Sequence, residues 1–271
     1  MSTRRIPQAL LTAVLLTATG VGLTTATASA EPAAQAAPAA QAAPAAQAAP
    51  AAQAAPAAQA APAAQGDFVV SKAQYNRMFP DHKRFYSYDA LVKAMKKYPA
   101  FADKGNVKTK KREAAAFLAN VSHETGGLVH IVEQNEANWP SYCDTTQPYG
   151  CPAGQSAYHG RGPIQLSWNF NYKAAGDALG IDLLHKPGLV QKKPVVAWKT
   201  ALWFWMTQSG AGTMTPHHAM VNGFGFGQTI RSINGAIECN GGNPAQVRSR
   251  VTTYKKFTRV LGVNPGRNLS C

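Results

Sequence analysis

The sequence predicts a mainly α-helical domain with long loops and one small, hairpin-like β piece. Two observations support this prediction. Apolar residues recur at helical spacing behind capping residues over most of positions 66–271, and strand-like patterns are confined to the short runs 129–133 and 162–166. Gly, Pro, Asn and Tyr are frequent between these two runs, so we expect long functional loops between about residues 125 and 165.

The expected helices have recognisable local signals. Their starts, in chain order, are at Ser71, Ser87, Lys111, Pro194, Thr215-Pro216 and Asn243-Pro244. The helix at 111–123 is rich in alanine and is followed by Gly126-Gly127, which would end it. The helix from Pro194 is very apolar, and we expect its Trp203 and Trp205 to lie in the core.

Residues 1–30 have the features of a secretory signal, and residues 31–65 have those of a linker. Arg4 and Arg5 precede an apolar run that is too short for a membrane span, and the small residues 28–30 form a cleavage site. The hexad Ala-Ala-Pro-Ala-Ala-Gln repeats from 36 to 65, and its prolines prevent a long helix. We therefore expect a secreted, extracellular protein whose folded domain is residues 66–271.

The chain is strongly basic, with 27 Lys and Arg against 13 Asp and Glu and a formal net charge of +14. Such a charge favours anionic partners, although solubility alone explains it equally well. The lysines occur in separate clusters that are not interleaved with aromatic residues. We therefore expect no nucleic-acid partner, no membrane partner, and a monomer.

Four cysteines are present, and four cysteines allow three pairings. Export to an oxidising compartment favours disulfides. The simplest pairing joins Cys143 to Cys151 and Cys239 to Cys271, which closes one short loop and fixes the last residue. A zinc site is a poor alternative because the chain has no Cys-x-x-Cys spacing, and we expect no metal.

Glu124 has the setting of a general acid. It lies at the end of the alanine-rich helix, where apolar neighbours and the negative end of the helix dipole disfavour a carboxylate. An acid that stays protonated can donate its proton to a leaving oxygen. His123-Glu124 also begins a zinc-protease motif, but position 127 is Gly where that motif needs His. A solvated Glu near a helix end is the other alternative.

Glu133 is a candidate for the partner base. It follows Glu124 by nine residues, across a glycine break, and could face it over a cleft. Carboxyl groups about 6.5–9.5 Å apart leave room for a water and predict inversion, whereas about 5–5.5 Å predicts retention. Glu136 is a rival for the same role, and either residue could be a solvated loop side chain.

A third motif has the groups that read sugars. Uncharged donors and acceptors alternate at Gln165, Ser167, Asn169 and Asn171. A serine nucleophile is a competing interpretation, but Gly-x-Ser-x-Gly is absent and no Asp-His partners are evident. Loop positions make three aromatic residues candidates for sugar platforms: Trp139, Tyr158 and Trp168.

Together these pieces resemble the family 19 chitinases, especially the secreted bacterial ones. The most specific match is Tyr-His-Gly-Arg-Gly-Pro-Ile-Gln-Leu-Ser at 158–167. The other matching runs are 122–127, 133–135, 199–203, 233–235 and 238–239, and the resemblance covers roughly residues 67–271 without a missing block.

The resemblance implies a lysozyme-like α+β fold with a bilobal cleft, and endo-acting hydrolysis of β-1,4-linked N-acetylglucosamine polymers with inversion. It implies Glu124 as general acid, Glu133 as general base, and Ser167 as the holder of the attacking water. It places Glu238 and Arg250 as a charged pair near the catalytic site. No cofactor is implied. The expected partners are chitin and chito-oligosaccharides, with fungal cell walls as a target. The matching sugar-cleft positions are His123, Gln165, Asn171, Lys199 and Asn234.

Two other functions remain open at this point. One is a lysozyme-like enzyme that cleaves peptidoglycan, which would share the fold class and the acid. The other is a catalytically silent protein that binds chitin or cell walls. The presence of both glutamates and of Ser167 argues against the silent protein, and a separate base argues against a lytic transglycosylase.

Overall fold

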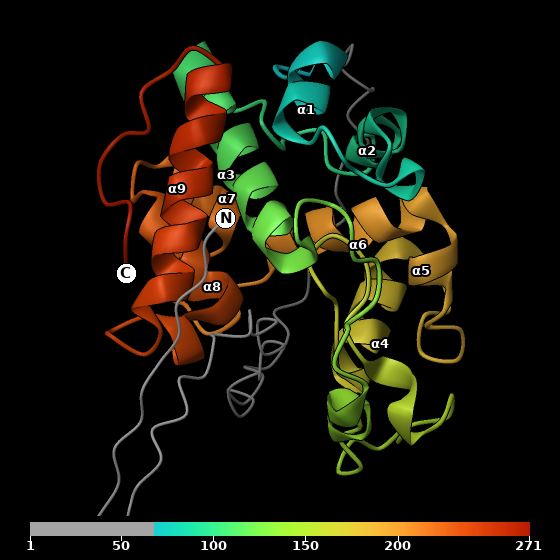
Figure 1. Ribbon diagram of the computed structural model, residues 1–271. Coiled ribbons are helices and arrows are strands. Elements are labelled where there is room, and N and C mark those ends of the chain that lie inside the picture. Colours follow the sequence, from blue (N-terminus) through green and yellow to red (C-terminus); the bar gives the residue numbers. More distant parts are fainter. Residues whose placement is uncertain (1–67) are drawn as a thin grey trace, which may run out of the picture. The chain divides into compact units, whose positions relative to one another are not determined.

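A computed structural model of the chain describes residues 68–271, and the predicted signal and linker lie outside these described residues (Figure 1). The described part is mainly helical. No helix within it is long and apolar enough to cross a membrane. The α-helices are α1 Lys72–Met78, α2 Tyr88–Met95, α3 Val107–Thr125, α4 Asn169–Leu179, α5 Leu189–Lys192, α6 Pro194–Thr207, α7 Pro216–Val221, α8 Phe226–Glu238 and α9 Pro244–Val260, with short 3-10 helices at Arg84–Tyr86, Glu136–Tyr142 and Gln155–Tyr158.

The predicted caps are where the helices begin. Ser71 forms a capping box at the start of α1, and side chains also cap α2, α7 and α9. Helix α3 starts earlier than predicted, because Asn106 accepts a hydrogen bond from the backbone of Thr109 and extends the helix to Val107. Helix α6 has no side-chain cap but begins with a proline, whereas α4, α5 and α8 have neither signal and were not predicted.

The core is built around α3, which lies beside α9 and α6 in Figure 1. The α3 residues from Ala114 to Ala119 are fully buried. Phe117 packs against the indole rings of Trp198 and Trp205 from α6, with ring centroids 6.1 and 5.3 Å apart. The burial of Trp203 and Trp205 is as predicted.

The predicted hairpin is present only in rudimentary form. Within residues 68–271 there is no strand, but isolated antiparallel bridges join Val132 to Arg161 and Arg161 to Leu166. The backbone N–H of Glu133 donates to the carbonyl of Gly160 at 2.9 Å. The described domain is therefore α-helical with bridged loops, and these bridges fix the backbone at Glu133.

Both disulfides have the pairing that the sequence favoured. Cys143 is bonded to Cys151 inside the long loop region, and Cys239 is bonded to Cys271. The second bond ties the end of the chain to the end of α8, and the N–H of Asn240 also donates to the carbonyl of Cys271 at 3.0 Å. The C-terminal segment is thereby fixed on the domain.

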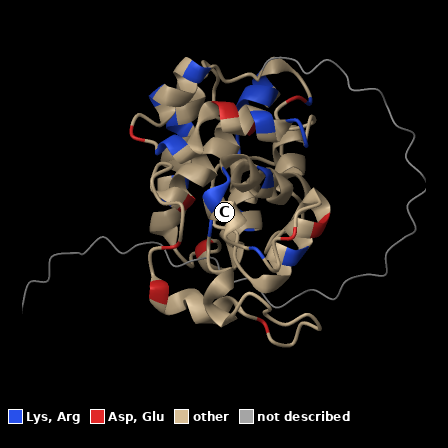
Figure 2. Cartoon of the chain, turned by 90° about the vertical axis from the view of Figure 1, so that its right-hand side faces the viewer, with Lys and Arg blue, Asp and Glu red and all other residues tan. Residues whose placement is uncertain are grey.

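The positive charge is unevenly distributed. In Figure 2, Lys and Arg are concentrated in the upper half of the view, at the end of the domain that holds α1, α2 and the start of α3. Asp and Glu are fewer and scattered, and three of the aspartates pair with a lysine nearby. The basic excess is therefore a property of the folded surface.

Candidate active site

Glu124 lies in the last turn of α3, and the sequence places it there through the glycines that follow. Gly126 adopts the left-handed conformation at φ 59° and caps α3, and Gly127 follows at φ 83°. A side chain at Gly126 would also come within 2.9 Å of the ring of His130. The helix therefore ends at Thr125, one residue after Glu124.

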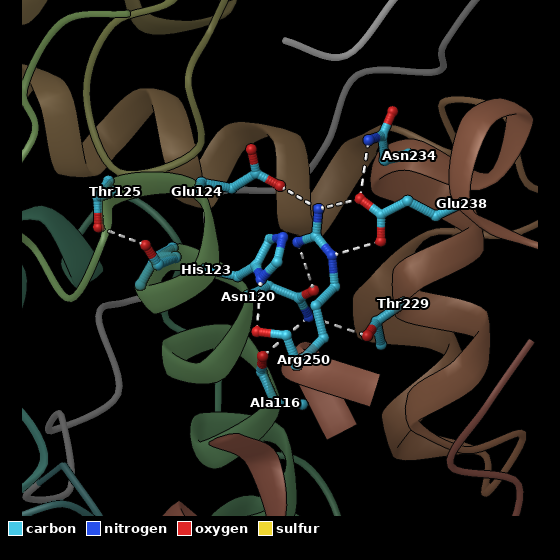
Figure 3. Close-up of polar contacts among 11 residues, drawn as sticks. Ala116, Asn120, His123, Glu124, Thr125, Thr229, Asn234, Glu238 and Arg250 are labelled. Atoms are coloured by element: carbon cyan, nitrogen blue, oxygen red, sulfur yellow. Dashed lines mark hydrogen bonds and ion pairs between the residues drawn. The ribbon is translucent and has the colours of Figure 1, made fainter. Parts of the chain in front are cut away.

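Arg250 of α9 joins Glu124 to Glu238 of α8 (Figure 3). Its Nη2 donates to Glu124 Oε1 at 2.5 Å and to Glu238 Oε1 at 2.7 Å, and its Nε donates to Glu238 Oε2 at 2.8 Å. The Arg250 side chain is 1% exposed. The predicted pair between Glu238 and Arg250 is thus an ion pair in the structure. Its extension to Glu124 was not predicted, and it replaces the apolar setting that we expected for this acid.

Burial and charge oppose each other in this cluster. Burial works to raise the pKa of the Glu238 carboxyl, but hydrogen bonds from Arg250 and Asn234 outweigh it, so this pKa is lowered. Burial works to lower the pKa of Arg250, but the two carboxylates hold it above its usual value. The pKa of His123 is lowered by burial and by the charge of Arg250, which keeps this imidazole neutral.

Asn120 supports the arginine from inside α3. Its Oδ1 accepts from Arg250 Nη1 at 3.2 Å, and its Nδ2 donates to the carbonyl of Ala116 and to Thr229 Oγ1, both at 3.0 Å. The side chain is fully buried. A lone Asn inside an alanine-rich helix was a signal that sequence reasoning could have used, since a buried amide needs partners.

Asn234 lies at a break in α8, where its φ of −143° departs from helical geometry. Its Nδ2 donates to Glu238 Oε1 at 2.8 Å. Its Oδ1 is buried and has no hydrogen-bond partner within the described residues. The amide therefore belongs to the same network as the two glutamates and keeps an acceptor free.

Glu133 is held by neutral donors only. Tyr142 donates its hydroxyl to Glu133 Oε1 at 2.9 Å, Asn138 donates to the same oxygen at 3.2 Å, and the N–H of Gly160 donates to Oε2 at 3.3 Å. The side chain is buried. Burial and the neighbouring carboxylate raise the pKa of Tyr142, so its hydroxyl stays a donor. The rival Glu136 is exposed at the start of its 3-10 helix.

Gly160 brings the third motif against Glu133. A Cβ there would lie 2.9 Å from Gln165 Oε1, 3.3 Å from Gln165 Cβ and 3.4 Å from Glu133 Cβ, so Gly160 packs closely against both residues. Ser167 is nearly buried and donates its hydroxyl to the carbonyl of Gln165 at 3.2 Å. Asn171 donates to the carbonyl of Ser167 at 3.0 Å. Gln165 thus lies beside Glu133, and Ser167 and Asn171 follow it along the chain.

Comparison with known proteins identifies the family. The sequence model for chitinase class I, glycoside hydrolase family 19, matches residues 68–271. The chain belongs to glycoside hydrolase family 19. Endochitinase B of Zea mays is 50% identical over 190 residues, which are 70% of this chain and 63% of the maize protein. The chain therefore spans less than two thirds of the length of that relative.

Solved family 19 structures share the fold. Chitinase C from Streptomyces griseus HUT6037 is 68% identical and superposes with a TM-score of 0.75, covering 76% of this chain and 99% of that chain. A class IV family 19 chitinase from Zea mays is 43% identical with a TM-score of 0.67, covering 77% of this chain and all of that chain. The mainly helical fold predicted here is therefore the family 19 fold.

The predicted aromatic platforms differ in this family 19 chain. Trp139 is half-buried and stacks on His159 with ring centroids 3.7 Å apart, while Trp168 is half-buried and stacks on Phe170. Tyr158 is fully buried, and its hydroxyl donates to the carbonyl of Leu184 at 2.8 Å. The prediction of Tyr158 as a sugar-binding residue is wrong, because its ring packs in the core and offers no face to a ligand.

Lys199 is half-buried on α6, and it makes no hydrogen bond or ion pair with the rest of the described chain. Within residues 68–271 no group of His, Cys, Asp and Glu could hold a metal ion. The residues that sequence reasoning missed are the supports: Asn120 behind Arg250, and Tyr142 and Asn138 around Glu133.

Proposed function

We propose that the domain is an inverting endochitinase that hydrolyses β-1,4-linked N-acetylglucosamine polymers. Membership of family 19 supports this proposal. The observation that carries it is the contrast between three glutamates. Glu124 and Glu133 are each held by hydrogen bonds from other residues, Glu124 from Arg250 and Glu133 from Tyr142, whereas Glu136 is exposed on its loop. Organised carboxylates are what a two-carboxylate glycosidase needs.

In the proposed reaction Glu124 donates a proton to the glycosidic oxygen while the bond from that oxygen to C1 breaks. Arg250 is bonded to two carboxylates, so its positive charge is divided between Glu124 and Glu238. Glu124 is therefore bound less strongly by Arg250 than it would be if the arginine contacted no other carboxylate. His123, the residue before Glu124, would contact the substrate as a neutral imidazole.

Glu133 would take a proton from a water that Ser167 holds, and that water would attack C1 from the face opposite the leaving group. Inversion follows because a single displacement occurs. The neutral donors around Glu133 hold its carboxylate in place without the positive charge that would weaken a base. Gln165, Asn171, Lys199, Asn234 and Trp139 would bind the sugar chain.

The test is the anomeric form of the first product. The purified chain is given chitohexaose, early products are resolved by proton NMR, and bacterial peptidoglycan is assayed in parallel. We expect α-anomer first and no release from peptidoglycan. Initial β-anomer would mean retention and a wrong geometry for the two glutamates. Cleavage of peptidoglycan alone would identify a lysozyme-like enzyme, and no cleavage of either substrate would identify a binding protein.

Substitutions of the three glutamates test the roles. Glu124→Gln and Glu133→Gln should each lower kcat by at least about 100-fold, while Glu124→Gln still binds chito-oligosaccharides. Glu136→Gln is the matched control, since it changes a neighbouring loop carboxylate, and it should be mild. Substantial turnover in Glu124→Gln would refute its assignment as the general acid. A severe loss in Glu136→Gln with a mild one in Glu133→Gln would identify Glu136 as the base.

We also propose that the protein is secreted, with residues 1–30 as a cleaved signal, 31–65 as a linker and 66–271 as the catalytic domain. The two disulfides support an oxidising destination. It would act as an extracellular monomer on chitin, including that of fungal cell walls. Mass spectrometry of the protein from culture medium tests the cleavage, and an intact residue 1 in that protein would contradict it.

A further inference from the structure

A pocket lies at the C-terminal segment, beside Arg112 of α3. Its volume is about 490 Å³. None of the proposed catalytic or sugar-binding residues lines it. The lining comes from α3, from the turn after α7 and from the segment after α9, and consists of Arg112, Gly223, Asn264, Pro265, Gly266 and Arg267. It contains two arginines and no acidic residue, so its charge is positive.

Both arginines have guanidinium donors to spare. Arg112 donates from Nε to the carbonyl of Asn264 at 2.9 Å and from Nη2 to the side chain of the same residue, which fixes the group and leaves Nη1 free. Arg267 is exposed and its side chain has no hydrogen bond or ion pair within residues 68–271. Neither arginine pairs with a carboxylate in the described chain. Planar guanidinium groups bind carboxylate and phosphate through paired hydrogen bonds.

The backbone of the pocket is held rigidly. Tyr254 donates its hydroxyl to the carbonyl of Pro265 at 2.9 Å, and the N–H of Gly227 donates to the carbonyl of Asn268 at 2.9 Å. A side chain at Gly225 would come within 2.6 Å of the carbonyl of Arg267, so the segment packs closely on the start of α8. Because the wall is preformed, little ordering would accompany binding.

An exposed aromatic residue follows the lining residue Gly223 in the sequence. Phe224 follows the lining residue Gly223, is 45% exposed, and stacks on His218 with centroids 5.6 Å apart. It is one of two large apolar side chains that the described chain exposes to this extent. A supported, exposed aromatic face is suited to the apolar side of a sugar ring.

We propose that this pocket is a second binding site, for a sugar polymer that carries carboxylate or phosphate groups. Arg112 and Arg267 bind the anionic group, and Phe224 packs against a neighbouring sugar ring. The basic excess of the domain surface attracts such a polymer before it docks (Figure 2). The site would hold the enzyme on an acidic cell wall independently of the chitin chain.

The test measures binding of the full chain to short oligomers by titration calorimetry. The probes are tetragalacturonate for the carboxylate source and a glycerol-phosphate oligomer for the phosphate source, with inorganic phosphate and neutral maltotetraose as references. We expect at least one charged oligomer to bind and maltotetraose not to bind. Binding should weaken as salt is raised, because the contact is ionic. Cleavage of chitohexaose, followed separately, should be the same in all variants.

The variants separate a site from general charge. Arg267→Gln should weaken binding by about tenfold or more, and Arg267→Lys should do so by less. Phe224→Ala should weaken binding of the charged sugar oligomer and leave binding of inorganic phosphate unchanged. Arg84→Gln is the matched control, since it removes one exposed charge from the 3-10 helix Arg84–Tyr86 and lines no part of the pocket. Equal losses in the Arg267 and Arg84 variants, no dependence on Phe224, or no binding at all would each overturn the proposal.

Discussion

Replacing Arg250 with methionine should strongly lower the free energy of unfolding of the domain. The Arg250 side chain is 1% exposed, and its guanidinium gives three hydrogen bonds to carboxylates. Two of them go to Glu238, whose side chain is 2% exposed. Methionine fills much of the same space but cannot pair with either charge. The variant would leave the Glu238 carboxylate buried without its cation. Glu124 would lose its ion pair too, and its side chain is only 11% exposed to solvent.

The size of the effect follows from what is left behind. Breaking a buried ion pair by removing one partner costs about 3–5 kcal/mol, because the remaining charge stays desolvated. Removing the charge of Glu238 as well should restore part of the lost free energy of unfolding. We therefore expect Arg250→Met to lower the free energy of unfolding by about 4 kcal/mol, and the double variant Arg250→Met/Glu238→Gln to lose about 2 kcal/mol less than that.

The pH dependence has a defined sign. The folded pKa of Glu238 lies below its ordinary value of 4.5, so its pairing stabilises the fold above that pH and is lost as pH falls through the folded pKa. The cost of Arg250→Met should therefore shrink in acid. Urea unfolding at pH 7 and near pH 4, with disulfides intact, measures all three chains. A loss under about 1 kcal/mol at pH 7, or a double variant no better than Arg250→Met, would refute this account of the network.

Three further predictions rest on single contacts. Tyr142→Phe removes a hydrogen bond to the Glu133 carboxylate, so steady-state kinetics should show kcat about tenfold lower with KM nearly unchanged; a change confined to KM would contradict a role at the base. Burial lowers the pKa of His159 to about 4, so between pH 6.5 and 4 protonation favours the unfolded chain. The free energy of unfolding, measured in urea, should therefore fall by about 3 kcal/mol over that range. His159→Gln should make the free energy of unfolding depend less on pH there, and an unchanged dependence would refute the assignment. Removing the bond between Cys239 and Cys271, which closes a loop of 32 residues, should lower the free energy of unfolding by about 4 kcal/mol in the same urea measurement. No loss would mean that packing alone fixes the C-terminal segment.

What could be predicted from the sequence was local. Four residues cap their helices in the same way, each accepting from the backbone N–H three positions ahead: Ser71, Ser87, Thr215 and Asn243. The chemistry that starts such a helix is therefore contained in four consecutive positions. The same holds for Gly126 at the end of α3, whose left-handed conformation needs no distant partner. Helix α8 was not predicted because it begins after Gly225, which has no side chain to cap it, and because its geometry is broken at Asn234.

The environment of the site could not be predicted in this way. Arg250 contacts Glu124 across 126 positions of sequence and Asn120 across 130, and nothing near Glu124 in the sequence announces a buried guanidinium. Apolar neighbours in the helix predicted an apolar setting for Glu124, but Arg250 from another helix forms an ion pair with it. Tyr158 failed for the related reason that a loop position does not fix exposure, since its hydroxyl reaches the carbonyl of Leu184 and draws the ring inward.

The two glutamates therefore differ in how far their surroundings depend on the whole fold. Glu133 takes its partners from Asn138, Tyr142 and Gly160, all within 27 positions, and a bridged loop would build most of this arrangement by itself. The partner of Glu124 arrives only when α3 and α9 have packed. A substitution that loosens α9 should thus disturb the acid while the base keeps its hydrogen bonds, which links the stability of the arginine network to the one catalytic group that it touches.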